Sequence, residues 1–450
     1  MKADLSAVKA EAVALLQSLI RFNTTNPPGN ELPLARFIHE KFSGEGIESR
    51  LLAPAENRGA VVARIPGDGR ARPVLLLAHM DVVGVEPDKW SCDPFAGVIR
   101  DGYVYGRGAF DDKGMLAANM MTMLLIQRGL SDSKKLSRDV VFVATSDEEG
   151  GGEAGIKWLV ANHPELLDAE FAINEGGRAR IIAGGKRYFA IQTAEKISHL
   201  VTLTARGPAG HASIPRDENA ILKLGRALER LCRYVEPLTL SDTARRFFGE
   251  LARVWSDADE KAAMTAVASS DAEEQVSGAA VLSRIPMFNA VIRNTIAPTI
   301  LAGGFQGNVI PAEASVVLNV RTMPNHSIDD VASRLRAAIG DADVDVAVTA
   351  RSADSPPSDI DSPMFRAIES SARELDPEMA VVPYLGAGAT DSAALRRIGI
   401  NAYGILPFPM GREDEERMHG HDERVSIESL NFGVRVIYDS VLRVGEKAEN

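Results

Sequence analysis

The sequence predicts an α/β protein in which a mixed β-sheet flanked by helices is joined to a smaller, inserted α+β domain. Short apolar runs alternate with helical stretches near both ends of the chain, as they do in an α/β sheet covered on both faces. Between residues 195 and 353 the apolar residues instead alternate in steps of two, as in half-exposed strands. The chain has 450 residues, too many for one compact core. We therefore expect one domain from residues 1–194 and 354–450, and a second from residues 195–353.

The elements of the larger domain follow from local patterns. Apolar residues recur at helical spacing over residues 5–22, and the Pro- and Gly-rich residues 24–29 form a loop. Residues 74–78 are apolar at every position, which indicates a strand buried on both faces. The other expected elements are apolar runs at 59–65, 140–145, 171–174 and 400–406 and helices at 31–42, 115–128, 155–162 and 362–375.

The inserted domain has a pattern of its own. Residues 199–205 alternate in steps of two, and so do 315–321 and 344–349, which predicts strands with one exposed face. The rest of this stretch is expected to hold an amphipathic helix at 219–234, helical structure over 240–280 and a return linker at 353–357.

Composition and charge exclude several functions. The formal net charge of −12 argues against binding nucleic acid or an anionic membrane, because such partners require basic patches. Cys92 and Cys232 form no CxxC pair, and this cysteine usage fits a reducing compartment. The sequence contains neither a signal-peptide core nor an apolar stretch of about 18 residues. We expect a soluble, cytoplasmic protein.

His79 and Asp81 directly follow the buried run at 74–78. Residues i and i+2 of a strand share one face, so both side chains can point the same way. A carboxylate beside a metal-binding histidine commonly accepts its second N–H and fixes its tautomer. An exposed strand end would contain the same residues, and this fragment alone leaves both interpretations open.

More acidic and imidazole side chains follow other predicted strands. Asp111 and Asp112 lie in a glycine-rich turn that matches neither a dinucleotide fingerprint nor a P-loop. Glu148 and Glu149 are adjacent, and a nearby cation would relieve their repulsion, leaving one as a ligand and one as a base. Nitrogen and oxygen ligands without cysteine suit zinc, with cobalt or manganese as substitutes, and bridging carboxylates suit two ions about 3.5–4 Å apart. The remaining candidates are Glu175, His419 and His421.

Taken in order, these motifs resemble the M20 family of metallopeptidases. The motifs are HMDVV, GRGAFDDKG, TSDEEGGG, NEGG, GHASIP, NVRTMP and HGHDERV, and the resemblance covers about residues 10–440. It implies two zinc ions per subunit, one held by His79, Asp111 and Glu175 and the other by Asp111, Glu149 and His419. Asp111 would bridge the two ions.

The resemblance also implies roles for the residues around the ions. Asp81 would orient His79, and the Asp111–Asp112 peptide bond would be cis. Glu148 would be the general base that takes a proton from water and passes it to the leaving amine. His421 competes with His419 for the ligand role, but the family spacing His-x-x-Asp/Asn-Glu favours His419.

The inserted domain would act as a lid and as the interface of a homodimer. In the family, a histidine of this domain reaches the oxyanion in the partner subunit, and His211 matches it. Arg321 and Asn308 match the residues that grip the substrate carboxylate, for which a planar guanidinium is well suited. Asn319 departs from the family pattern, which often has Asp there, so Arg321 lacks its usual charged neighbour.

The implied activity is zinc-dependent hydrolysis of a peptide or N-acyl amide bond beside a free carboxylate, releasing an amino acid. Residues 236–305 are longer than the lid of the smallest members and resemble the subgroup of carboxypeptidase S and the N-acyl-amino-acid hydrolases. The alternatives are a narrow biosynthetic deacylase, acting on acetylornithine or succinyl-diaminopimelate, and a non-catalytic binding protein.

Overall fold

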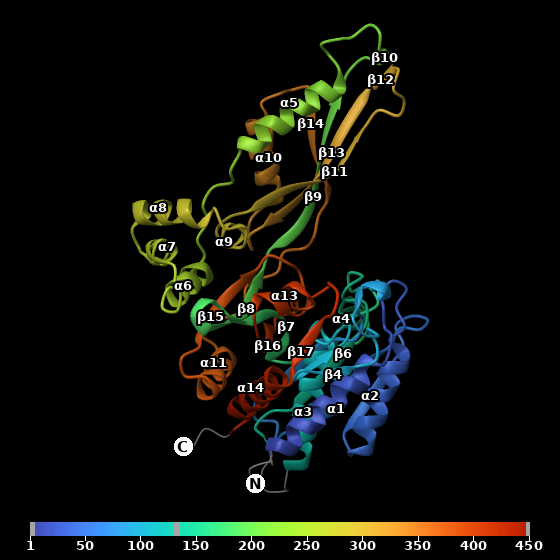
Figure 1. The fold of residues 1–450 in the computed structure, drawn as a ribbon, viewed down its shortest axis with the longest axis vertical. Helices are drawn as coiled ribbons and strands as arrows, with labels where there is room; N and C mark the ends of the chain where they lie inside the picture. The colour runs from blue at the N-terminus through green and yellow to red at the C-terminus, as the bar shows by residue number, and fades with distance from the viewer. Residues whose placement is uncertain (1–4, 130–135, 447–450) are drawn as a thin grey trace.

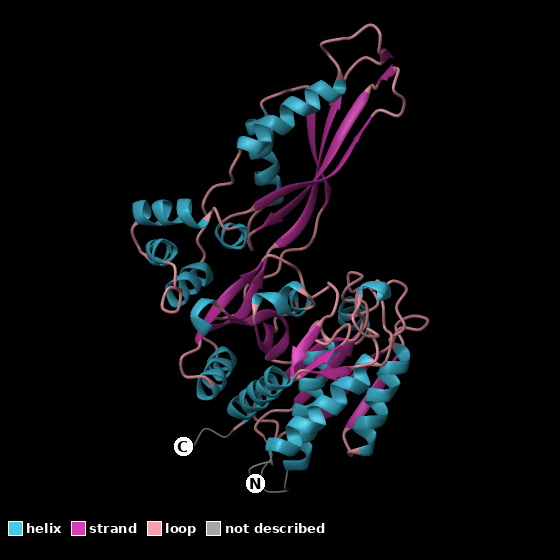
Figure 2. Cartoon of the chain, viewed as in Figure 1, coloured by secondary structure: helices cyan, strands magenta, loops and turns pink. Residues whose placement is uncertain are grey.

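The computed structural model describes residues 5–129 and 136–446 (Figure 1). A large domain holds an eight-stranded sheet with helices around it, and an elongated small domain built on a four-stranded sheet projects from it (Figure 2). The expected fold class, a mixed α/β sheet flanked by helices, is confirmed. Within the described residues, no helix combines the length and the apolar character that crossing a membrane requires.

The large sheet has the strand order β1-β2-β6-β3-β7-β16-β8-β15. Its central strands β6, β3, β7 and β16 are parallel, whereas β1, β2 and β6 pair in antiparallel fashion, so the sheet is mixed. The strands are β1 (Glu48–Leu52), β2 (Ala60–Ile65), β3 (Val74–His79), β6 (Val140–Thr145), β7 (Phe171–Ile181), β8 (Arg187–Glu195), β15 (Ala380–Gly386) and β16 (Asn401–Met410).

Successive residues of β3 face two different cores, because side chains alternate along a strand. Leu76 packs into the core shared with α1, α2, α3, α11 and α14, whereas Leu75 and Leu77 pack into the core shared with α4 and α12. All six residues of β3 are buried, and His79 is the last of them. The helices are α1 (Leu5–Ile20), α2 (Leu32–Gly44), α3 (Lys113–Gly129), α4 (Ile156–Asn162), α11 (Pro363–Leu375), α12 (Ser392–Arg397) and α14 (Ile427–Gly445).

The small domain is a four-stranded antiparallel sheet in the order β11-β13-β9-β14. Helices α5 (Ala220–Arg233) and α10 (Ile328–Ile339) pack on the sheet. Buried and partly exposed residues alternate along β9, as the two-residue pattern predicts. The strands are β9 (Ile197–Arg206), β11 (Thr295–Gly303), β13 (Glu313–Thr322) and β14 (Val344–Ala350), and the short pair β10 (Gly210–His211) and β12 (Val309–Ile310) lies at the far tip (Figure 1).

Four helices of the middle stretch pack against the large sheet. Phe247 and Phe248 share a core with Tyr188 of β8 and Val382 of β15. The helical structure expected over 240–280 is divided by two aspartates, Asp257 and Asp271, which cap the helices that follow them. The division of the chain at 194/195 and 353/354 stays a prediction. The helices are α6 (Asp242–Leu251), α7 (Ala258–Ala268), α8 (Ala272–Leu282) and α9 (Pro286–Ile292).

A three-stranded sheet brings the late part of the chain back to the early part. Its order is β17-β5-β4, with β4 (Val98–Arg100), β5 (Tyr103–Tyr105) and β17 (Arg424–Ser426). Helix α13 (Arg412–Glu416) lies between β16 and β17 in the sequence. This sheet therefore places residues 419–423 beside the turn that carries Asp111.

Candidate metal centre

His79 ends β3 at the carboxyl edge of the sheet. Its Nδ1 lies 3.0 Å from the backbone oxygen of Asp81 and 3.4 Å from Asp81 Oδ1, while its Nε2 lies 3.1 Å from Asp111 Oδ1. A hydrogen bond from Nδ1–H to Asp81 leaves Nε2 as the ligand atom. The i, i+2 spacing therefore brings His79 and Asp81 together, with the shorter contact going to the carbonyl of Asp81.

Asp111 lies between two histidines. His419 Nε2 is 3.1 Å from Asp111 Oδ2 and 3.0 Å from Glu149 Oε1, so each oxygen of Asp111 faces a different imidazole. The Asp111–Asp112 peptide bond is cis, as the resemblance implied. Burial alone would raise the pKa of Asp111, but hydrogen bonds with His419 and His79 outweigh it and lower the pKa below its usual range. One carboxylate between two imidazoles is the arrangement that a bridging ligand requires.

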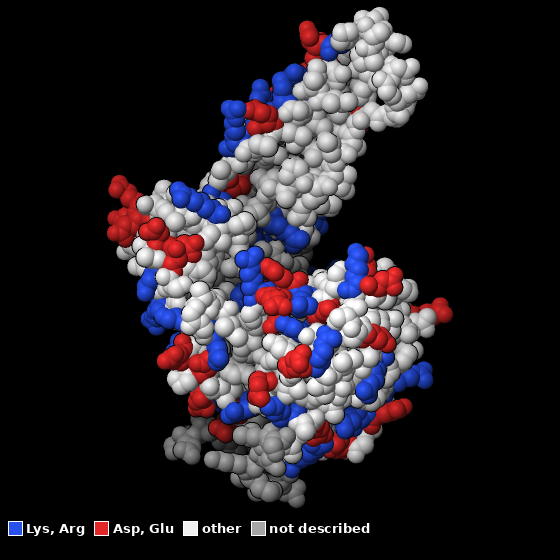
Figure 3. All heavy atoms as spheres, viewed as in Figure 1, with Lys and Arg blue, Asp and Glu red and all other residues white. Residues whose placement is uncertain are grey.

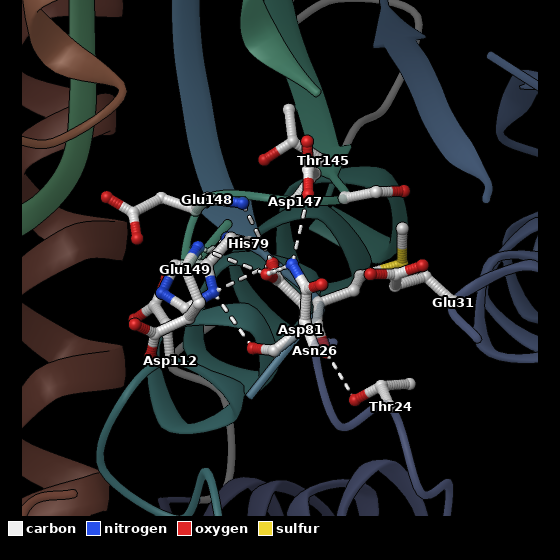
Figure 4. A network of polar contacts seen from close by, with 12 residues as sticks. Thr24, Asn26, Glu31, His79, Asp81, Asp112, Thr145, Asp147, Glu148 and Glu149 are labelled. Atoms are coloured by element: carbon white, nitrogen blue, oxygen red, sulfur yellow. Dashed lines mark hydrogen bonds and ion pairs between the residues drawn. The ribbon is translucent and has the colours of Figure 1, made fainter. Parts of the chain in front are cut away.

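Asp81 also connects the loops of the site. It is buried, and its two oxygens accept the backbone N–H groups of Glu148 and Glu149, each at 3.1 Å. The side-chain amide of Asn26 donates to Asp81 Oδ2 at 2.8 Å and to Asp147 Oδ1 at 3.0 Å (Figure 4). Asp81 therefore fixes the backbone of the two glutamates as well as the ring of His79.

Glu423 fastens the turn that carries Asp111, a role that sequence reasoning missed. Its Oε1 accepts the N–H groups of Phe110 at 2.9 Å and Asp111 at 3.0 Å, and its Oε2 accepts from Gly108 N–H at 3.1 Å and Arg107 at 2.6 Å. Glu423 is 1% exposed, so the pair with Arg107 is buried. Its place in the HGHDERV motif was the only signal in the sequence.

The carboxylates around Asp111 outnumber the cations that face them. Burial, together with the charges of Asp111 and Asp112, raises the pKa of Glu175 well above its usual range. Glu149 Oε1 is buried, and among the described residues its one close partner is His419 Nε2 at 3.0 Å, which also faces Asp111. Ligand atoms of His79, Asp111 and Glu149 lie within 4.8 Å of one another. Imidazole and carboxylate donors that lie this close together fit divalent cations such as zinc.

The carboxylate of Glu148 lies beside this cluster, where the charges of His79, Glu175 and Asp111 act on it. Its backbone N–H donates to Asp81 Oδ1, and its carboxylate points away from Asp81 (Figure 4). It lines a cavity of about 270 Å³ together with Lys196, Thr390 and Asp391. Burial raises the pKa of Glu148 well above its usual range, and the charge of His79 opposes this shift. A half-buried carboxylate beside a cavity can exchange protons with a bound molecule.

Four other predicted or competing residues lie elsewhere. His421 Nε2 is 3.6 Å from Glu86, so this ring faces Glu86, whereas His419 faces Asp111 and Glu149. His211, in β10, and Asn308, beside β12, lie together at the far tip of the small domain, away from the centre of the same chain (Figure 1). Arg321, on β13, donates to Asn319 Oδ1 at 3.0 Å and forms no ion pair with any described residue.

Comparisons with known proteins agree with this geometry. The model of peptidase family M20/M25/M40 matches residues 75–443. An N-fatty-acyl-amino acid synthase/hydrolase PM20D1 of Xenopus tropicalis is 29% identical over 82% of this chain and 72% of its own. A probable carboxypeptidase S-like 2 of Dictyostelium discoideum is 30% identical over 82% of this chain and 71% of its own.

A solved structure shares the fold. The M20 family metallo-carboxypeptidase Sso-CP2 of Sulfolobus solfataricus is 19% identical, with a TM-score of 0.68 over 96% of this chain and 99% of its own. The family match spans more than half of the sequence, and it includes the strands and turns that carry His79, Asp111, Glu149 and His419. The chain therefore belongs to peptidase family M20/M25/M40 and is a hydrolase.

Proposed function

We propose that the protein is a two-zinc hydrolase that cleaves a peptide or N-acyl amide bond beside a free carboxylate and releases an amino acid. The observation that carries this proposal is Asp111 between His79 and His419, with Glu148 at the adjoining cavity. The names of the relatives, an N-fatty-acyl-amino acid synthase/hydrolase and a probable carboxypeptidase S-like protein, support this substrate class.

His79, Asp111 and Glu175 would hold one ion, and Asp111, Glu149 and His419 the other. When bound, the ions would supply Lewis acidity and lower the pKa of a coordinated water. Glu148 accepts the proton of the attacking water and delivers it to the leaving amine. Asp81 keeps Glu148 in place, because it holds the Glu148 backbone N–H at 3.1 Å.

The substrate carboxylate would bind at the base of the small domain. Arg321 is half-buried and has a neutral neighbour, Asn319, in place of a carboxylate. Its guanidinium therefore keeps its charge free for a bidentate contact with an anionic ligand. Lys196 lies near Arg321, since the charge of Arg321 adds to burial in lowering the pKa of Lys196 to about 7. Arg321 therefore favours substrates that carry a free carboxylate.

His211 and Asn308 would act in a second subunit. Strand β11 is the edge of its sheet, contains no charged residue and is exposed along most of its length, with Ile300 62% and Leu301 69% exposed. Figure 3 shows this side of the small domain almost free of charge. An exposed apolar edge strand invites pairing with a second chain. A homodimer through this edge would bring the tip of one subunit to the other subunit's centre.

A substrate panel on zinc-loaded protein tests the activity. The panel contains N-acyl amino acids with short, long and aromatic acyl groups, dipeptides, N-acetylornithine and N-succinyl-diaminopimelate. Glu148→Ala should lower kcat by about 10²–10⁴. The matched control is Glu153→Ala, which removes an exposed glutamate of the same loop and should leave turnover intact. Equal turnover of wild type and Glu148→Ala would contradict the role of Glu148, and no hydrolysis of any compound would contradict the activity.

Mixed dimers test the role of the tip. His211→Ala and Glu148→Ala should each be nearly inactive alone. A mixture that has exchanged subunits should regain activity, because one site then combines an intact Glu148 with an intact His211. No gain on mixing, or a monomer in sedimentation experiments, would contradict the dimeric site.

A further inference from the structure

A second cavity, of about 700 Å³, lies on the large domain away from the predicted ligands. Its walls come from the first half of α14, the end of β16, the start of α13 and β17, which gather at the front of the large domain (Figure 1). Phe110, Phe408 and Phe432 form an apolar part of the lining. This volume is within the range of small-molecule binding sites.

An arginine and an asparagine of this cavity have hydrogen-bonding atoms that no described residue uses. Arg435 is half-buried and makes neither a hydrogen bond nor an ion pair with any described residue, although its charge acts on Asp439, four positions further along α14. Asn431 Oδ1 is buried without a hydrogen bond. Both residues belong to α14 and are four positions apart, so their side chains are neighbours on one helix face. A buried polar atom without a partner is rare in native proteins, and Asn431 Oδ1 therefore indicates that a ligand completes this part of the cavity.

The other arginines of the cavity are already paired. Arg424 donates to Asp414 at 2.7 Å and to the Tyr105 hydroxyl at 2.8 Å. Arg187 pairs with Asp376 at 2.9 Å, and Arg412 pairs with Glu416 at 2.6 Å. The carboxylates of the lining are paired as well: Glu413 with Arg417, Asp414 with Arg424 and Glu428 with Lys9. Among the described residues that line the cavity, Arg435 is therefore the arginine without a hydrogen bond or an ion pair.

The cavity adjoins the support of the metal centre. Phe110, in its wall, precedes Asp111 in the sequence, and Arg424, in another wall, follows Glu423. Glu423 accepts the N–H groups of both Phe110 and Asp111. A ligand that contacts and displaces Phe110 or Arg424 would therefore also shift the backbone that positions Asp111.

We infer that this cavity binds a free α-amino acid with an apolar side chain and that its occupant influences the metal centre. The carboxylate binds Arg435, the ammonium group donates to Asn431 Oδ1, and the side chain packs among the phenylalanines. Such an amino acid is a product of the reaction proposed above, and its identity as product rests on that proposal. The site then provides feedback by product, with binding coupled to Asp111.

Calorimetric titration with L-leucine tests the site in zinc-loaded Arg321→Gln protein, which lacks the carboxylate contact of the active site. One binding site should remain. Arg435→Gln or Asn431→Leu, added to this background, should weaken Kd by about tenfold or more. Two analogues of leucine should bind the Arg321→Gln protein about tenfold or more weakly than leucine does. They are 4-methylpentanoate, which lacks the ammonium group, and 3-methylbutylamine, which lacks the carboxylate. The matched control Arg412→Gln removes a charge at the rim whose side chain is 91% exposed, and should leave Kd unchanged.

Several results would overturn the inference. These are the absence of a leucine site in the Arg321→Gln protein, or equal Kd values for the Arg435→Gln and Arg412→Gln variants. The circular dichroism spectrum of each variant shows whether it is folded, which separates loss of leucine binding from loss of the fold. Leucine should also change the zinc affinity measured against a competing chelator, and an unchanged affinity would remove the coupling to Asp111. Leucine binding without any Glu148-dependent hydrolysis would leave this site in place and refute the proposed function alone.

Discussion

Replacing Glu423 by glutamine tests whether one buried carboxylate holds the Asp111 turn. Glu423 accepts four hydrogen bonds, from Arg107 and from the backbone N–H groups of Gly108, Phe110 and Asp111. A glutamine side chain keeps one acceptor oxygen but replaces the other with an NH₂ group, which cannot accept a hydrogen bond. The two hydrogen bonds to the replaced oxygen are therefore lost. Arg107, 2% exposed, is left without its counter-charge. Removing one member of a buried ion pair costs about 3–5 kcal/mol.

The assay is urea unfolding of zinc-loaded protein, followed by circular dichroism, together with a zinc competition experiment. Glu423→Gln should lower the free energy of unfolding by about 3–5 kcal/mol and weaken zinc binding about 10- to 100-fold. Glu428→Gln is the matched control, since its side chain is 78% exposed and a surface pair contributes at most about 1 kcal/mol. A loss below about 1 kcal/mol in Glu423→Gln, with zinc affinity unchanged, would refute the reasoning.

Three further outcomes are expected. Burial alone would raise the pKa of Glu415, but Arg180 and Arg178 lower it from 4.5 to about 2. The ionised Glu415 therefore stabilises the fold above pH 4.5, and this stabilisation is lost as the pH falls towards 2. After allowance for partial exposure, thermal melts should show Glu415→Gln to be about 2 kcal/mol less stable at pH 7, with the difference nearly gone at pH 2. Asn319→Asp gives Arg321 a competing carboxylate, and should raise KM about 3- to 10-fold while kcat stays within about twofold; an unchanged KM would argue against Arg321 as the carboxylate contact. Chelation of the metals should abolish turnover and lower Tm, and added zinc should restore both; full activity after dialysis against chelator would exclude the metal centre.

The large domain could be predicted from the sequence because its strands are short, apolar and bounded by loops. Residues 74–78 illustrate this, since β3 is buried at all six positions. Strand β11 was not expected as an element, although Pro298 within an apolar run is typical of an edge strand, and the register shifts between Pro298 and Ile300. Helix α14 was also missed, and no motif suggested that its Asn431 and Arg435 would line a cavity.

The acidic run 413–416 contains glutamates in two different environments, which the local sequence does not distinguish. Charge runs are usually solvated, and Glu413, with a side chain 71% exposed, fits that expectation. Glu415 does not, because it contacts Arg178 at 2.9 Å and Arg180 at 2.6 Å from a side chain 25% exposed. These arginines lie more than 200 positions earlier in the chain, and no periodicity within the run separates the two glutamates.

The residues that were found from sequence and those that were missed differ in what they touch. The predicted ligands end strands or occupy glycine-rich turns, where a short motif marks them. Glu423, which was missed, accepts backbone N–H groups, and so does Asp81, which was predicted only to orient His79. Every residue except proline carries a backbone N–H group, so these contacts leave no mark on the sequence of the partner. Through these contacts the two carboxylates hold the loops of Glu148, Glu149 and Asp111 in place. The ligand geometry is therefore set by anions that are not themselves ligands, and Glu423→Gln should disturb the centre while leaving every ligand present.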